Sequence, residues 1–141
     1  MYGVFEDVFM DAQANSVSLC LEFLDIAQAD VDMVYIFFYI CEGSYYFKPF
    51  FRKGIHIIYP EMLSDREGVM ELLRYGADDA RNIQRVCKSY NKKCPYEMKL
   101  FFDTRTHKFD AQYSHEPPKG DDSPADHFYN WIDTIEKQFR S

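Results

Sequence analysis

The sequence lacks the short motifs that mark most catalytic and metal sites. Its six glycines are isolated from one another, so it has no glycine-rich phosphate-binding loop, and it has no Gly-x-Ser-x-Gly nucleophile turn. The histidines are scattered, without the spacing of a helical metal site. They are His56, His107, His115 and His127. These gaps favour a protein that is not an enzyme, with no catalytic residues, no metal ion and no other cofactor.

Cysteines are few, and they lack paired spacing. None of the four forms the Cys-x-x-Cys pattern of a zinc knuckle or of a redox-active dithiol. They are Cys20, Cys41, Cys87 and Cys94. We therefore expect reduced, mostly buried thiols, as in a cytoplasmic protein. A nucleophilic Cys94 or Cys41 paired with a distant histidine is an alternative that the spacing leaves open.

Long hydrophobic runs are also absent. The longest, residues 33–41, is far too short to span a bilayer. The start of the chain carries Glu6 and Asp7, where a secretory signal would carry Lys or Arg. The sequence therefore predicts a cytoplasmic protein with no membrane partner.

Basic residues are missing from the first third of the chain. Residues 1–47 contain eight acidic residues and no Lys or Arg, whereas the other 94 residues contain 15 acidic and 16 basic ones. The net charge of −7 therefore comes from this first third. Such a segment disfavours direct binding to nucleic acid and favours a basic partner. An acidic helix face that only keeps the protein soluble would give the same pattern.

What the sequence does contain is a regular succession of helix and strand patterns, which we interpret as one domain over residues 1–141. A chain of this length that is 47% hydrophobic can bury a core without metal or disulfides. Apolar residues at helical spacing predict an amphipathic helix over residues 4–27, and two poor helix formers, Asn15 and Ser16, favour an interruption there. Residues 33–40 are apolar on both alternating faces, which predicts a central strand covered on both sides.

Two more strands and a long helix are expected next. Residues 45–52 suit an antiparallel return strand in which Pro49 marks an edge or a bulge, and residues 55–59 suit a short third strand. Ser64 and Glu67 have the spacing of a capping box, which predicts a helix that begins at about Asp65. Gly76 within that helix indicates either a close approach to the sheet or an ordinary surface glycine.

The last part of the chain predicts a hairpin and a third helix. Apolar and polar residues alternate on both sides of a polar break within residues 94–115, as in two half-buried antiparallel strands. Ser123 and Pro124 have the order of a helix start, and Trp131 belongs to the helix that follows. The predicted fold is therefore α+β, with a mainly antiparallel sheet of about five strands packed by three helices.

Two pairs of carboxylates are candidates for chemistry. Asp103 and Asp110 flank the hairpin turn and could act together as acid and base, although turn residues that accept hydrogen bonds from backbone amides explain them as well. Asp121 and Asp122 lie in a proline-rich loop, where they suit either weak cation binding or plain solvation. Neither pair establishes an active site.

The order of elements over nearly the whole chain resembles the YezG-like immunity proteins. The resemblance rests on the aromatic strand pair at 34–40 and 45–51, on the segments Pro95 to Leu100 and Lys108 to Tyr113, and on a closing helix with Trp131. It implies a cytoplasmic bacterial antitoxin in contact-dependent inhibition, one that neutralises a secreted or contact-delivered toxin, commonly a nuclease, by binding it. That protein would have no catalytic activity of its own.

An acidic surface with aromatic side chains would suit such a partner. Charge complementarity of this kind speeds association and selects the partner. We therefore expect the toxin to contact acidic residues of the first third, the loop acids and two tyrosines. These candidates are Glu22, Asp25, Asp30, Asp32, Tyr45, Tyr113, Asp121 and Asp122. A non-catalytic adaptor or scaffold domain is the alternative, followed by a small enzyme whose site is assembled only in space.

Overall fold

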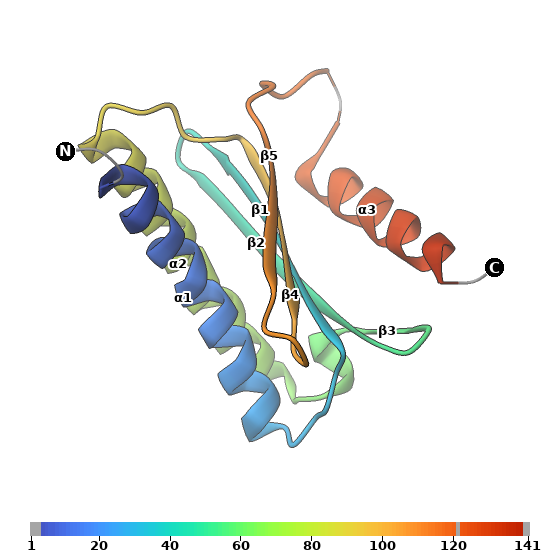
Figure 1. Ribbon diagram of the computed structural model, residues 1–141. Helices are drawn as coiled ribbons and strands as arrows, with labels where there is room; N and C mark the ends of the chain where they lie inside the picture. The colour runs from blue at the N-terminus through green and yellow to red at the C-terminus, as the bar shows by residue number, and fades with distance from the viewer. Residues whose placement is uncertain (1–3, 121, 140–141) are drawn as a thin grey trace.

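A five-stranded antiparallel sheet lies between two helices on one face and a single helix on the other (Figure 1). The computed structural model describes residues 4–120 and 122–139. The strand order is β3-β2-β1-β4-β5. The elements are α1 (Val4–Ile26), β1 (Met33–Cys41), β2 (Ser44–Lys53), β3 (His56–Ile58), the 3-10 turn η1 (Pro60–Met62), α2 (Arg66–Ser89), β4 (Glu97–Asp103), β5 (Phe109–Ser114) and α3 (Pro124–Gln138). The predicted α+β fold is confirmed.

Strand β1 is the central strand that its two apolar faces predict. Ile36 and Phe38 pack with α1 and α2, whereas Tyr35 and Phe37 pack with α3. All four side chains are at most 2% exposed. Because successive side chains point to opposite faces, a strand buried on both sides must be apolar at every position.

Strand β2 accommodates a proline because its neighbour is short. Pro49 pairs with Ile36 of β1, while β3 reaches only Phe51 to Lys53 of β2. Because β3 does not extend to Pro49, β2 has an open edge there. The missing N–H of proline therefore removes no hydrogen bond between strands on that side. The predicted edge position is confirmed.

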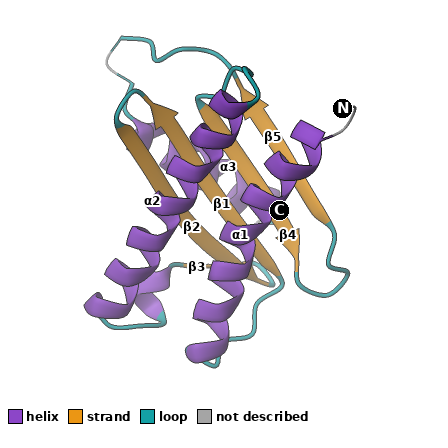
Figure 2. Cartoon of the chain, turned by 90° about the vertical axis from the view of Figure 1, so that its left-hand side faces the viewer, coloured by secondary structure: helices purple, strands orange, loops and turns teal. Residues whose placement is uncertain are grey.

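Helices α1 and α2 run antiparallel, side by side, over one face of the sheet (Figure 2). Helix α1 is continuous through the predicted interruption at Asn15 and Ser16, so that expectation was wrong. The buried Ser16 hydroxyl donates to the carbonyl of Gln13, which satisfies it within the helix. Gly76 of α2 lies against the sheet, and a Cβ there would stand 2.0 Å from the ring of Phe47. This glycine therefore permits a close approach of helix to sheet.

The start of α2 differs from the predicted capping box by one residue. The cap is Asp65, whose carboxylate accepts a hydrogen bond from the Gly68 amide at 2.8 Å. A charged acceptor complements the positive end of the helix dipole better than the Ser64 hydroxyl does. The Ser64 side chain instead lies against the first turn of α2. Its hydroxyl oxygen is so close to Gly68 that a Cβ on that glycine would stand 2.1 Å from it.

The β4–β5 hairpin forms as the alternation predicts. Its turn begins at Asp103, whose carboxylate accepts from the backbone amides of Arg105 and Thr106. These two amides lower the pKa of Asp103. Asp110 accepts from the Ala111 amide. Both carboxylates thus serve the local backbone, as turn residues do.

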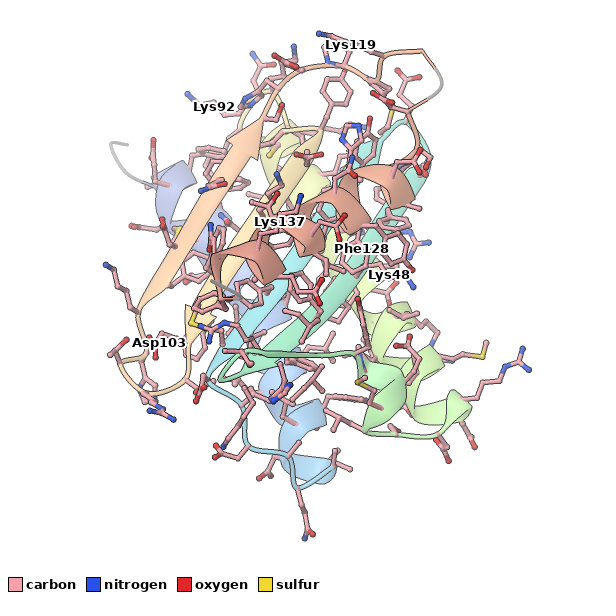
Figure 3. All side chains as sticks on the ribbon, turned by 90° about the vertical axis from the view of Figure 1, so that its right-hand side faces the viewer. Lys48, Lys92, Asp103, Lys119, Phe128 and Lys137 are labelled. Carbon is pink, nitrogen blue, oxygen red and sulfur yellow. The ribbon has the colours of Figure 1, made fainter. Side chains whose placement is uncertain are left out.

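Helix α3 begins at Ser123, which forms the capping box with Asp126. Figure 3 shows the helix lying over the middle of the sheet, with much of β5 beyond it. The buried Trp131 anchors it against rings from three strands, at 5.8 Å from Tyr35, 5.2 Å from Phe50 and 5.5 Å from Phe101. Among the described residues, no helix is long and apolar enough to cross a bilayer.

Candidate functional site

The described surface has a groove between α1 and α2, with a volume of about 710 Å³. We call it the α1–α2 groove. Its walls come from the C-terminal half of α1 and the N-terminal half of α2, together with the segment before α2. The lining residues are Asn15, Ser18, Leu19, Glu22, Phe23, Ile26, Ala27, Leu63, Ser64, Gly68, Glu71, Leu72, Tyr75, Asp78 and Asp79.

Apolar side chains form a large part of the groove surface. Leu19, Phe23 and Leu63 are only half-buried where they line it. Ile26 is 77% exposed and Tyr75 is 46% exposed, and both line the same groove. The groove therefore offers apolar surface that a ligand would cover.

Four carboxylates and no Lys or Arg line the groove. Asp78 is paired with Arg81 at 2.6 Å, which places one basic side chain at the margin. Arg74 is a second, with its guanidinium 5.3 Å from the Tyr75 ring. Within the described part of the chain, Glu22, Glu71 and Asp79 make no side-chain hydrogen bond or ion pair. The groove is therefore apolar in its walls and negatively charged.

Asp79 is held in an unfavourable environment. Partial burial raises the pKa of its carboxyl to about 6, and the neighbouring Asp78 adds to this. Burial, and to a lesser degree the charge of Asp79, raise the pKa of the Cys20 thiol of α1 far above its usual range. A carboxylate without a partner in such a place lowers stability, so it is a candidate for a functional role.

Metal binding has no support in the described residues. No three His, Cys, Asp or Glu side chains among them are arranged to hold a metal ion. The groove carboxylates lie along its length on two helices, so they present separate charges to a long ligand. This geometry suits the binding of another macromolecule.

The chain was compared with known families and proteins. No family model matches it, and no curated protein matches it. The function proposed below therefore depends on the groove and on the sequence.

Of the acidic residues predicted to contact a toxin, Glu22 lines the groove. Asp25 lies one turn away on α1, exposed and outside the groove lining among the described residues. Asp30 is ion-paired with Lys53. Asp32 accepts from the Gly54 amide and from Arg105, and the amide is the larger cause of its lowered pKa. These two carboxylates tie loops together, and their contact with a partner stays a prediction.

The remaining predicted contacts in the described structure lie outside the groove lining. The Tyr45 hydroxyl donates to Gln84 of α2. The hydroxyl of Tyr113, on β5, donates to the buried Gln13 side chain at 2.8 Å. Asp122 is exposed, 3.8 Å from His127, and Asp121 is outside the described residues. The structure therefore does not gather the predicted residues on one surface.

Sequence reasoning missed the α2 side of the groove. Its members are Glu71, Tyr75, Asp78 and Asp79. A signal was present, because these residues recur at spacings of three and four and so share one helix face. The basic residues Arg74, between them, and Arg81, just after them, masked this face in a linear reading of charge.

Proposed function

We propose that this protein is an immunity protein that binds and neutralises a cognate bacterial toxin, a basic nuclease, through the α1–α2 groove. The observation that carries the proposal is a large apolar groove lined by four carboxylates and by no Lys or Arg. Three of these carboxylates have no hydrogen-bond or ion-pair partner among the described residues. A basic protein would supply both the apolar contact and the missing cations.

The position of Asp79 supports a partner that carries positive charge. A partly buried carboxylate without a counter-ion is unfavourable in the free protein, which its raised pKa reflects. An incoming Lys or Arg would stabilise the ionised form and remove that penalty. Pairing with a cation of the partner therefore contributes free energy to binding, because Asp79 has no ion pair within the described part of the free protein.

A nuclease is the kind of toxin that fits this charge. Enzymes that act on nucleic acids present basic surfaces to the phosphate backbone. A carboxylate-lined groove is complementary to such a surface and would compete with the substrate for it. The proposed inhibitor acts in the cytoplasm by binding alone, with no cofactor and no catalysis of its own.

The direct test is co-expression with a candidate toxin domain, a basic nuclease encoded next to this chain. The proposal expects growth to be rescued and the two chains to purify as a stable complex. Growth arrest with no complex would overturn it. Recovery of many unrelated proteins, without rescue, would instead favour an adaptor.

A further inference from the structure

The walls of the α1–α2 groove restrict what can lie in it. Both walls are helices, whose backbone N–H and C=O groups are already bonded within each helix. An extended peptide in this groove would find no strand edge to pair with, so its own backbone groups would lie unpaired against apolar side chains. A helix satisfies its backbone internally and can bury one apolar face without this loss.

We propose that the groove receives an amphipathic α-helix of the partner protein, one whose apolar ridge is flanked by Lys and Arg. This inference rests on the proposed function, because it takes the partner to be a basic protein. It adds the form and the pattern of the segment that binds. The apolar ridge contacts Phe23, Ile26 and Tyr75, and the basic flanks contact Glu22, Glu71 and Asp79.

The length of the groove suits such a segment. Its lining on this side extends from Asn15 of α1 to Ala27, just after the helix, which corresponds to roughly 18 Å at the rise of an α-helix. A bound helix of about three turns would cover this distance. Three turns place two or three apolar residues along one ridge, with basic residues on either side.

The distribution of charge along the groove sets the orientation of the basic flanks. Because α1 and α2 are antiparallel, Asp78 and Asp79 lie near the Asn15 end, and Leu63 lies near the Ala27 end. Asp78 already has Arg81 as its partner, so the unpaired charge near the Asn15 end is that of Asp79. We expect a Lys or Arg of the bound helix to lie against Asp79.

A second copy of this chain is a poor occupant. Pairing two copies through this face would bring together four carboxylates from each groove, on chains that each carry a net charge of −7. Like charges held close in an interface oppose association. The groove therefore favours a partner of opposite charge.

The first experiment titrates the full isotope-labelled chain with a synthetic peptide of about 15 residues, long enough to form a helix. The peptide carries Leu at helical spacing and Lys and Arg on both flanks. Its control has the same composition in scrambled order, so it has the same charge but no apolar ridge. We expect backbone NMR shifts to change at Leu19, Phe23, Leu72 and Tyr75 with the amphipathic peptide, and binding to weaken by about tenfold with the scrambled one.

Matched variants separate charge from shape. The double variant Glu71→Gln with Asp79→Asn removes two groove charges, and Asp7→Asn with Asp11→Asn removes two exposed charges of α1 outside the groove. We expect about tenfold weaker peptide binding for the first variant and little change for the second. For the apolar ridge, Ile26→Ser should weaken binding, whereas Met70→Ser, at an exposed Met of α2 outside the groove lining, should not.

Several outcomes would overturn the inference. These are equal binding of the two peptides, shift changes centred on β5 or α3, or equal effects of the paired variants. Self-association that the groove variants abolish would identify a second copy as the occupant instead. Growth rescue by the double groove variant, with wild-type affinity for the toxin domain, would support the immunity function and overturn the proposed groove helix. If the peptide bound in the groove but the wild-type chain did not rescue growth, the groove helix would be supported and the immunity function would be overturned.

Discussion

The two helical layers of this protein treat charge in opposite ways. Under α3, Glu97 lies 2.7 Å from the His127 ring nitrogen and 3.7 Å from the Lys99 ammonium, so its carboxylate is matched within the chain. In the α1–α2 groove, Asp79 has no such partner in the described structure and its pKa rises. Glu97 therefore has partners within the chain, whereas Asp79 would gain from a cation that another molecule brings.

The layers also differ in where their exposed apolar side chains lie. On the α3 side, Trp131 is 4% exposed and packs edge-on against rings of the sheet, and the exposed Tyr129 (54%) lies outside the groove. On the groove side, Ile26 and Tyr75 remain exposed at the mouth of the hollow. We conclude that both helical layers stabilise the fold, and the proposed binding surface lies on the α1–α2 layer.

The largest expected effect comes from Trp131→Ala. Removing this buried ring leaves a cavity between α3 and the sheet, so the free energy of unfolding should fall by about 3–5 kcal/mol. Chemical denaturation followed by circular dichroism measures this. At a temperature where the variant is still folded, affinity for the partner should match the wild type. A loss of affinity in folded protein would show that α3 belongs to the binding surface.

Gly76→Ala tests the close contact of α2 with the sheet. The added Cβ would overlap the Phe47 ring, which should cost about 1–3 kcal/mol of stability despite the better helix propensity of Ala. Thermal unfolding measures the loss. Combining it with Phe47→Leu supplies the control, because removal of the ring should make the alanine less costly. If Gly76→Ala lowered the stability equally with and without Phe47→Leu, the close contact between Gly76 and Phe47 would be contradicted.

Asp79→Asn should stabilise the free protein near neutral pH. The raised pKa means that the folded protein holds this proton to a higher pH than the unfolded chain, so stability falls as pH rises from 3.8 to about 6 and is level above that. Removing the charge should recover about 1 kcal/mol above that range, after discounting for solvent screening of a partly exposed group. Denaturation of both proteins across this range measures the difference, which should vanish at the acid end. A variant that is less stable near neutral pH would contradict the proposed environment.

Two neighbouring acids of α1 give the smallest and sharpest contrast. Glu22→Gln should weaken binding of the toxin domain by about fivefold, and Asp25→Asn should leave it nearly unchanged, because only Glu22 is among the described residues that line the groove. Surface plasmon resonance at two salt concentrations would show the difference mainly at low salt. Equal losses would extend the binding surface beyond the groove.

Much of the fold was predictable because it depends on local pattern. The two apolar faces of β1, the proline at an edge and the Ser123 cap each follow from a few neighbouring residues. The interruption expected at Asn15 and Ser16 was wrong, because tertiary packing holds the helix together where propensity is weak.

The site was less predictable because it is assembled from two helices. Glu22 was identified from the acidic first third of the chain, but that argument could not select it over Asp25, since both are acidic residues on the same helix. Asp79 lies in a stretch of α2 with mixed charges, and only the pairing of α1 with α2 shows that it faces the groove. Charge counts along a sequence do not reveal which carboxylates lack a partner.

The most direct test of the groove is the affinity of the toxin domain for three versions of the full chain. These are the wild type, the groove variant Glu71→Gln with Asp79→Asn, and the control Asp7→Asn with Asp11→Asn. Both variants lose two negative charges, so any general effect of net charge is the same in both. The account predicts that the groove variant binds at least about tenfold more weakly while the control stays close to the wild type. Equal affinities of the two variants would contradict it.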